Sequence, residues 1–78
     1  MMEELRQMMQ NGAVTFQYKK KDGSTRTATG TLCESIIVED GGAMPKGTGT
    51  VPQDTFPYWD LNSNGWRCFK TEYFISII

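Results

Sequence analysis

Short runs in which apolar and polar residues alternate dominate the first part of the chain and predict β-strands. Residues 14–18 (Val-Thr-Phe-Gln-Tyr) follow the two-residue period of a half-buried strand. The Lys-Asp-Gly-Ser sequence at 21–24 then predicts a hairpin turn, because Asp and Gly favour turn conformations. Residues 25–32, rich in β-branched threonine, predict the returning strand, with Gly30 as a bulge or sharp bend.

A second hairpin is predicted near the C-terminus. Residues 55–61 and 65–70 are rich in aromatic side chains and flank an Asn64-Gly65 pair. Asn-Gly is typical of a type I′ turn, in which both central residues need a positive φ. The last five residues, Phe-Ile-Ser-Ile-Ile at 74–78, predict a final strand.

The remaining segments are less regular. Residues 2–10 predict a short helix, with apolar residues at helical spacing and an Asn-Gly pair at 11–12 that ends it. Residues 35–38 (Ser-Ile-Ile-Val) fit either a short strand or a helical turn. Residues 45–50 (Pro-Lys-Gly-Thr-Gly-Thr) predict a loop whose Lys46 would form a lip for an anion, although the spacing does not match a phosphate-binding P-loop.

Together these elements predict one domain over residues 1–78, of the mainly β class. We expect a small SH3/Sm-like barrel of about five strands, with the short N-terminal helix capping one end. Of the two tryptophans, Trp59 and Trp66, we expect one in the core and the other partly exposed, because both do not fit inside so small a barrel. The residues predicted to build the core are Phe16, Leu32, Phe56, Leu61, Phe69, Phe74 and Ile77.

Charge is nearly balanced over the chain as a whole. Eight Lys and Arg residues stand against nine Asp and Glu, and the net charge is −1. Binding to duplex DNA usually needs a broad basic face, so any anion-binding surface in this chain must be local. The lysine run at 19–21, at a hairpin tip, is more typical of a solvated charge cluster than of a recognition element. The alternative is that it forms one such patch with Arg26 on the returning strand, suited to a single-stranded nucleic acid.

The residue types offer little for catalysis or metal binding. The chain has no histidine, and its two cysteines, Cys33 and Cys68, are too few for a four-ligand zinc site. We expect both cysteines to be small core residues rather than a disulfide. Asp60, the acid of the aromatic hairpin, is expected to form a structural ion pair with Arg67 or Lys70. We therefore expect no enzyme activity, no cofactor and no metal.

The N-terminal segment is charged and lacks the apolar run of a signal peptide. No apolar stretch is long enough to cross a bilayer. We therefore expect no membrane partner and a location in the reducing cytoplasm of a bacterial host cell.

Motifs along nearly the whole chain occur in a familiar order: Val14-Thr15-Phe16, Lys21-Asp22-Gly23-Ser24, Ala28-Thr29-Gly30-Thr31-Leu32, Pro45-Lys46-Gly47-Thr48-Gly49, Tyr58-Trp59-Asp60-Leu61, Trp66-Arg67-Cys68-Phe69-Lys70 and Ile75-Ser76-Ile77. In these motifs the chain resembles a family of short phage and mobile-element proteins described as WYL-like domains with an Sm/SH3-type small β-barrel. The resemblance implies that barrel and a phage or mobile-element setting. Larger WYL domains are regarded as sensors that bind nucleotides or nucleic acid, and the resemblance carries this role to Tyr58, Trp66 and Arg67.

The function predicted from these observations is that of a non-catalytic phage or mobile-element module that binds a nucleotide-like or single-stranded nucleic-acid ligand. Trp66 and Tyr58 would stack on the ligand, and Arg67, Lys70 and Lys46 would pair with its phosphates. Such a protein would sequester a host signalling nucleotide and so counter immunity.

The alternative function is that of a protein–protein adaptor or inhibitor acting on a host or phage protein. It would use the same aromatic face or the edge strand Ile75 to Ile78. An apolar edge of this kind tends to pair with another strand, so the same residues would also support a homo-oligomer.

Overall fold

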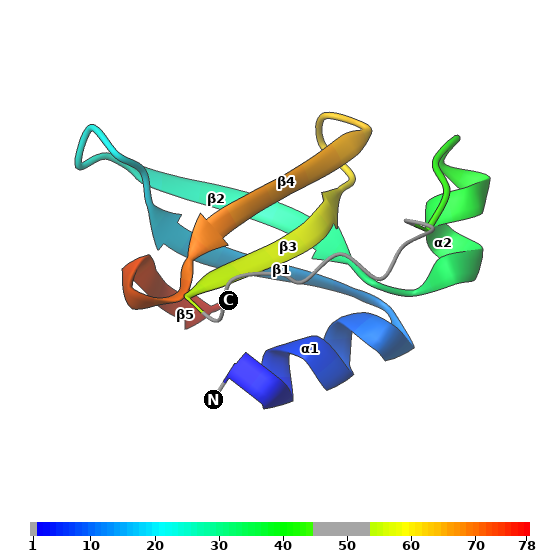
Figure 1. The fold of residues 1–78 in the computed structure, drawn as a ribbon, viewed down its shortest axis with the longest axis horizontal. Coiled ribbons are helices and arrows are strands. Elements are labelled where there is room, and N and C mark those ends of the chain that lie inside the picture. The colour runs from blue at the N-terminus through cyan, green and yellow to red at the C-terminus, as the bar shows by residue number, and fades with distance from the viewer. Residues whose placement is uncertain (1, 45–53) are drawn as a thin grey trace.

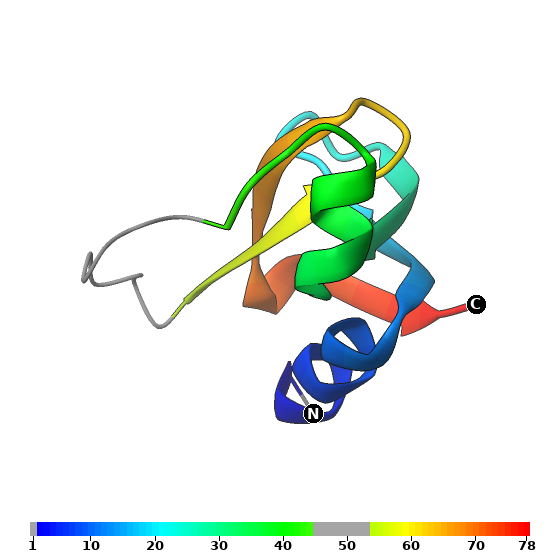
Figure 2. The same cartoon turned by 90° about the vertical axis from the view of Figure 1, so that its right-hand side faces the viewer.

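The computed structural model describes residues 2–44 and 54–78 and has the predicted mainly β architecture, consistent with a small Sm/SH3-like barrel (Figure 1). Five antiparallel strands form one sheet in the order β4-β3-β2-β1-β5. The predicted N-terminal helix is present, and Figure 2 shows it below the sheet while a second helix lies against the sheet's side. The elements are α1 (Met2–Asn11), β1 (Ala13–Lys19), β2 (Thr25–Thr31), α2 (Glu34–Glu39), β3 (Thr55–Asp60), β4 (Gly65–Lys70), the 3₁₀ turn η1 (Thr71–Tyr73) and β5 (Phe74–Ile77).

The first predicted hairpin is confirmed. Strands β1 and β2 pair from Ala13 opposite Thr31 to Lys19 opposite Thr25. Gly23 has a φ of 89° in the turn, a conformation that side chains with a Cβ disfavour. Asp22 accepts hydrogen bonds from both the backbone N–H and the hydroxyl of Ser24, and these bonds lower the pKa of Asp22.

Gly30 does not form the bulge or bend that the sequence predicted. It pairs in register with Val14 on one side and with Asp60 on the other. A Cβ atom at position 30 would lie 2.4 Å from Cδ2 of Tyr58. Glycine is therefore required because the Tyr58 ring packs directly over this backbone, not because the strand bends.

The second hairpin is also present, but its turn is not the predicted type I′ turn. Asp60 pairs with Gly65, so the connection is a four-residue loop over 61–64. Asn64 alone has a positive φ, of 54°, whereas Gly65 belongs to β4. The Asp60 carboxylate accepts the backbone N–H of Asn62 at 2.8 Å, and this bond favours the longer loop.

The core lies between the sheet and α1. Leu5 and Met9 of α1 are fully buried, and the segment at 35–38 is helical, with Ile37 of α2 also buried. Of the seven residues predicted for the core, Phe16, Phe56 and Phe69 are buried in it. Leu32 and Phe74 are half-buried and pack against it, whereas Leu61 is half-buried outside it and Ile77 is 40% exposed, so those two predictions are wrong. The core cluster consists of Leu5, Met9, Val14, Phe16, Tyr18, Ala28, Phe56, Tyr58 and Phe69.

The two tryptophans divide as predicted, whereas the cysteines do not. Trp59 is buried and Trp66 is 37% exposed. Cys33 is half-buried and Cys68 is exposed, and both are free thiols, so the expectation of two core cysteines is wrong. None of the helices in the described ranges has the length and apolar character needed to span a membrane.

Candidate functional site

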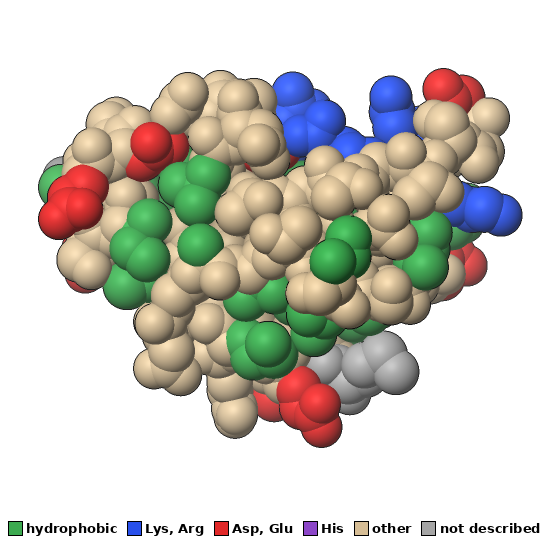
Figure 3. Space-filling model, turned by 180° about the vertical axis from the view of Figure 1, so that it is seen from behind, with side chains coloured by type: hydrophobic (Ala, Val, Ile, Leu, Met, Phe, Trp, Pro, Cys, Tyr) green, Lys and Arg blue, Asp and Glu red, His purple; other side chains and the backbone are tan. Residues whose placement is uncertain are grey.

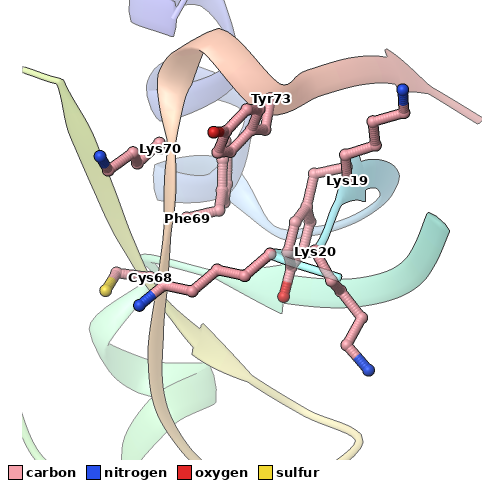
Figure 4. Close-up of a pocket in the computed structure, with 8 residues that line it drawn as sticks. Lys19, Lys20, Cys68, Phe69, Lys70 and Tyr73 are labelled. Carbon is pink, nitrogen blue, oxygen red and sulfur yellow. The ribbon is translucent and has the colours of Figure 1, made fainter. Parts of the chain in front are cut away.

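A pocket of about 400 Å³ opens between the end of β1 and strand β4 (Figure 4). Cys68 and Lys70 of β4 lie on one side of it, Lys19 and Lys20 lie on the other, and Tyr73 closes the upper end. Its lining residues are Tyr18, Lys19, Lys20, Lys21, Cys68, Phe69, Lys70 and Tyr73. We call this the seam pocket.

The topology of the sheet explains why these distant segments meet. Within the described residues, β4 pairs only with β3, and β5 pairs only with β1. No hydrogen-bonded strand pairing therefore joins β4 to the far end of β1 in the described sheet, and this leaves an opening between them. The short η1 turn leads directly from β4 into β5, which places Tyr73 at the rim of this opening.

Two stacked aromatic rings contribute the inner wall of the seam pocket. The centroids of Tyr18 and Phe69 are 4.8 Å apart and the planes are inclined by 17°. Both residues are buried, and the Tyr18 hydroxyl hydrogen-bonds that of Tyr58 at 3.1 Å. This inner wall is fixed by the core, whereas the other lining residues, four lysines with Cys68 and Tyr73, are exposed.

The seam pocket is strongly cationic. Four of the eight Lys and Arg residues of the chain line it, and none of its lining residues is acidic. Asp22 in the neighbouring turn is already engaged by Ser24. Figure 3, a view from behind, shows basic side chains at the top and right of the molecule, and acidic side chains at the left, at the bottom and also beside the basic ones at the right. A local positive potential is therefore present on a chain whose net charge is −1.

The predicted ligand-binding residues do not converge on one place. Lys70 lines the seam pocket. Tyr58 is fully buried in the core, so its ring is closed to a ligand and its predicted stacking role is corrected. Trp66 and Arg67 are not among the pocket's lining residues. Lys46 lies outside the described residues.

Arg67 forms an ion pair with Asp60, one of the two partners predicted for this carboxylate. The Asp60 side chain is fully buried and pairs with Arg26 and with Arg67, whose Nε lies 3.4 Å from the carboxylate. Arg67 Nε also donates to the Ser63 hydroxyl at 2.9 Å. The cost of burying the carboxylate is offset by the two guanidinium groups, so this cluster is a structural feature of the barrel.

The same polar cluster sets two pKa values. Desolvation opposes the charge of Arg26, but the hydrogen bond and the charge of Asp60 outweigh it and raise the pKa of Arg26. Burial, with the hydrogen bond to Tyr18, raises the pKa of Tyr58 well above its usual range. Tyr58 is therefore neutral in the folded protein at any physiological pH.

Trp66 belongs to a different surface, at the opposite end of β4 from Lys70. Its ring meets Trp59 edge to face at a centroid distance of 5.7 Å. Its Nε1 donates to the carbonyl of Ala43, and Trp59 Nε1 donates to Asp40 at 2.8 Å. The indole therefore helps to fix the segment after α2 against the second hairpin.

The sequence reasoning identified only part of the seam pocket. The sequence offers a basic patch at 19–21 only as an alternative to a solvated charge cluster, and Lys70 lines the same pocket because of how the sheet curls. Tyr73 was not singled out, because a tyrosine in a short connection carries no local signal of its position at a rim. In the part of the chain that the structure describes, no group of three or more His, Cys, Asp or Glu residues could hold a metal ion.

Comparison with known proteins identifies the family. No curated protein and no solved structure matches the chain. The family profile described as WYL_2, Sm-like SH3 beta-barrel fold, matches residues 2–75, nearly the full length of the chain. The five-stranded antiparallel sheet agrees with that description. The chain therefore belongs to the WYL_2 family of Sm-like SH3 β-barrel domains.

Proposed function

We propose that the protein is a non-catalytic binding module that holds a nucleotide-like or single-stranded nucleic-acid ligand in the seam pocket. The observation that carries this proposal is the gathering of Lys19, Lys20, Lys21 and Lys70 around one pocket without any acidic lining residue. Ammonium groups bind phosphate as compact point charges, and several of them together favour a ligand with more than one phosphate.

The size of the pocket supports a nucleotide-sized group. Ligand pockets in proteins usually measure about 300–1,000 Å³, and the seam pocket, at about 400 Å³, lies near the lower limit. Four of the eight basic residues line this one pocket, and the net charge of the chain is −1. Both features favour a mononucleotide or a single strand over a duplex.

The proposal includes a biological setting. A phage or mobile-element protein of this size, acting in the bacterial cytoplasm, would sequester a host signalling nucleotide and so blunt an immune response. The setting rests on the resemblance of the sequence motifs to short phage and mobile-element proteins, and the cationic pocket supports the chemistry. Sequestration needs affinity but no turnover, which agrees with a pocket that offers cationic binding groups.

Fluorescence anisotropy with a labelled short oligothymidylate, and competition by ATP, tests the proposal. We expect the double variant Lys20→Ala/Lys70→Ala to lose at least about tenfold in affinity, because two phosphate contacts are removed. Arg6→Gln is the control. This substitution also removes a positive charge, but Arg6 lies on α1 and does not line the pocket. Absence of binding, or equal weakening by the control, would contradict the proposal.

A second candidate function is supported by β5. Ile75, Ile77 and Ile78 are 46%, 40% and 68% exposed, and the outer edge of β5 has no strand partner among the described residues. An exposed apolar edge strand favours pairing with a protein partner or with a second copy of this chain. Light scattering tests the second-copy form: Ile77→Lys should convert a dimer or larger oligomer to monomer, whereas a monomeric wild-type protein would refute it.

A further inference from the structure

Tyr73 is the one aromatic side chain of the seam pocket whose ring is open to a ligand. It is 39% exposed, whereas Tyr18 and Phe69 are 7% and 5% exposed. No hydrogen bond and no aromatic contact to Tyr73 occurs within residues 2–44 and 54–78. The ring lies outside the core cluster and is partly exposed at the rim of the pocket (Figure 4).

The position of Tyr73 relative to the lysines gives the site two chemically different parts. Lys70 lies three residues before Tyr73, and both line the same pocket as the 19–21 lysine run. Figure 4 shows the Lys70 and Lys19 side chains on opposite sides of Tyr73 with their amines pointing apart, so an aromatic ring lies between cationic side chains of one pocket. Single-strand-binding proteins combine the same two elements, cations for the phosphates and aromatic rings on which bases stack.

We infer that Tyr73 stacks on the base of the bound ligand and makes the pocket selective for base-bearing phosphates over bare polyphosphate. This inference rests on the proposed function, since it assumes that the lysines hold the phosphates. Trp66 cannot supply the stacking face, because it lies at the far end of β4 and is held against Trp59 and Ala43. Tyr58 cannot supply it either, because it is fully buried.

Removal of an aromatic ring on which a base stacks lowers the affinity for the ligand by about 5- to 150-fold. Tyr73→Leu removes the aromatic face and keeps an apolar side chain. Tyr73→Phe keeps the face and removes only the hydroxyl, so it is the matched control. Because Tyr73 is exposed and outside the core cluster, both variants should keep the melting temperature of the wild type.

The experiment measures the affinities of the wild type and both variants for ATP, inorganic tripolyphosphate and a short oligothymidylate. ATP and tripolyphosphate share a triphosphate chain and differ in the nucleoside. We expect Tyr73→Leu to lower the affinities for ATP and oligothymidylate by about 5- to 150-fold and to leave the affinity for tripolyphosphate unchanged. Tyr73→Phe should bind all three probes as the wild type does. The relative affinities for ATP and oligothymidylate then distinguish a free nucleotide from a nucleic-acid strand as the source of the base.

Two results would overturn the inference while leaving the proposed function intact. One is equal binding of ATP and tripolyphosphate by the wild type, and the other is an unchanged affinity for ATP in Tyr73→Leu. If all three probes fail to bind the wild type, the proposed function itself is wrong and the inference falls with it.

Discussion

Salt should weaken ligand binding at the seam pocket in proportion to the number of lysines that contact phosphate. Four lysines line the pocket. For single strands, each neutralised phosphate contributes about −0.7 to the slope of log K against log salt concentration, so four contacts give a slope of about −2.8. Raising the salt concentration from about 50 to about 200 mM should then lower the affinity for a single strand by about 50-fold.

Removing one of these lysines gives the sharper form of the prediction. Lys70→Ala should change the slope to about −2.1, so the same rise in salt should cost only about 20-fold. Arg6→Gln should leave the slope at its wild-type value, because Arg6 does not line the pocket. Anisotropy titrations of a labelled oligothymidylate at four or more salt concentrations measure these slopes. A wild-type slope near zero, or an identical slope in Lys70→Ala, would refute the reasoning.

Three further predictions concern the barrel that holds the pocket. Gly30→Ala should lower the free energy of unfolding in urea by about 1–3 kcal/mol, because the new Cβ would lie 2.4 Å from Tyr58, whereas Gly12→Ala, with no atom within 4 Å, should not show this overpacking cost. Asp60→Asn should cost about 1–3 kcal/mol, because Arg26 and Arg67 lose a charged acceptor but both remain partly exposed to water, and exposed Asp54→Asn should change the melting temperature little. The pKa of Tyr58 is raised in the folded state, so its contribution to the free energy of unfolding is complete below the unfolded-state pKa near 10 and decreases as the pH rises above that value. The free energy of unfolding of Tyr58→Phe should therefore decrease less steeply with alkaline pH than that of the wild type. Parallel curves would contradict this.

Local patterns were sufficient for α1 and for the strands, but they left the segment that forms α2 open between a strand and a helical turn. The alternation at 14–18 and the Asp-Gly turn that follows it determine the first hairpin, because both signals lie within a few residues. The spacing at 55–70 likewise predicted the second hairpin. The predicted type I′ turn of this hairpin was wrong, because the Asp60 carboxylate accepts a hydrogen bond from the backbone of the loop. This interaction competes with the intrinsic turn preference of Asn-Gly.

The candidate site could be predicted only in part, for a physical reason. Alternation places Tyr58 and Asp60 on one face of β3, but it does not state which face is interior. The interior face is set by contacts far apart in sequence, such as the packing of Tyr58 over Gly30 and the pairing of Asp60 with Arg26. The same long-range closure brings Lys70 beside the 19–21 lysine run, which no local spacing encodes.

The central claim is that ligand binds at the seam pocket, and the two cysteines allow it to be tested directly. Cys68 lines the pocket, whereas Cys33 precedes α2 and does not. A hydrogen bond from the Ser35 hydroxyl lowers the pKa of Cys33, so this thiol remains a reactive internal reference. The measurement is the alkylation rate of each cysteine by iodoacetamide, with and without saturating oligothymidylate. We predict that the ligand slows Cys68 and leaves Cys33 unchanged; bound ligand that leaves Cys68 as reactive as before would contradict the account.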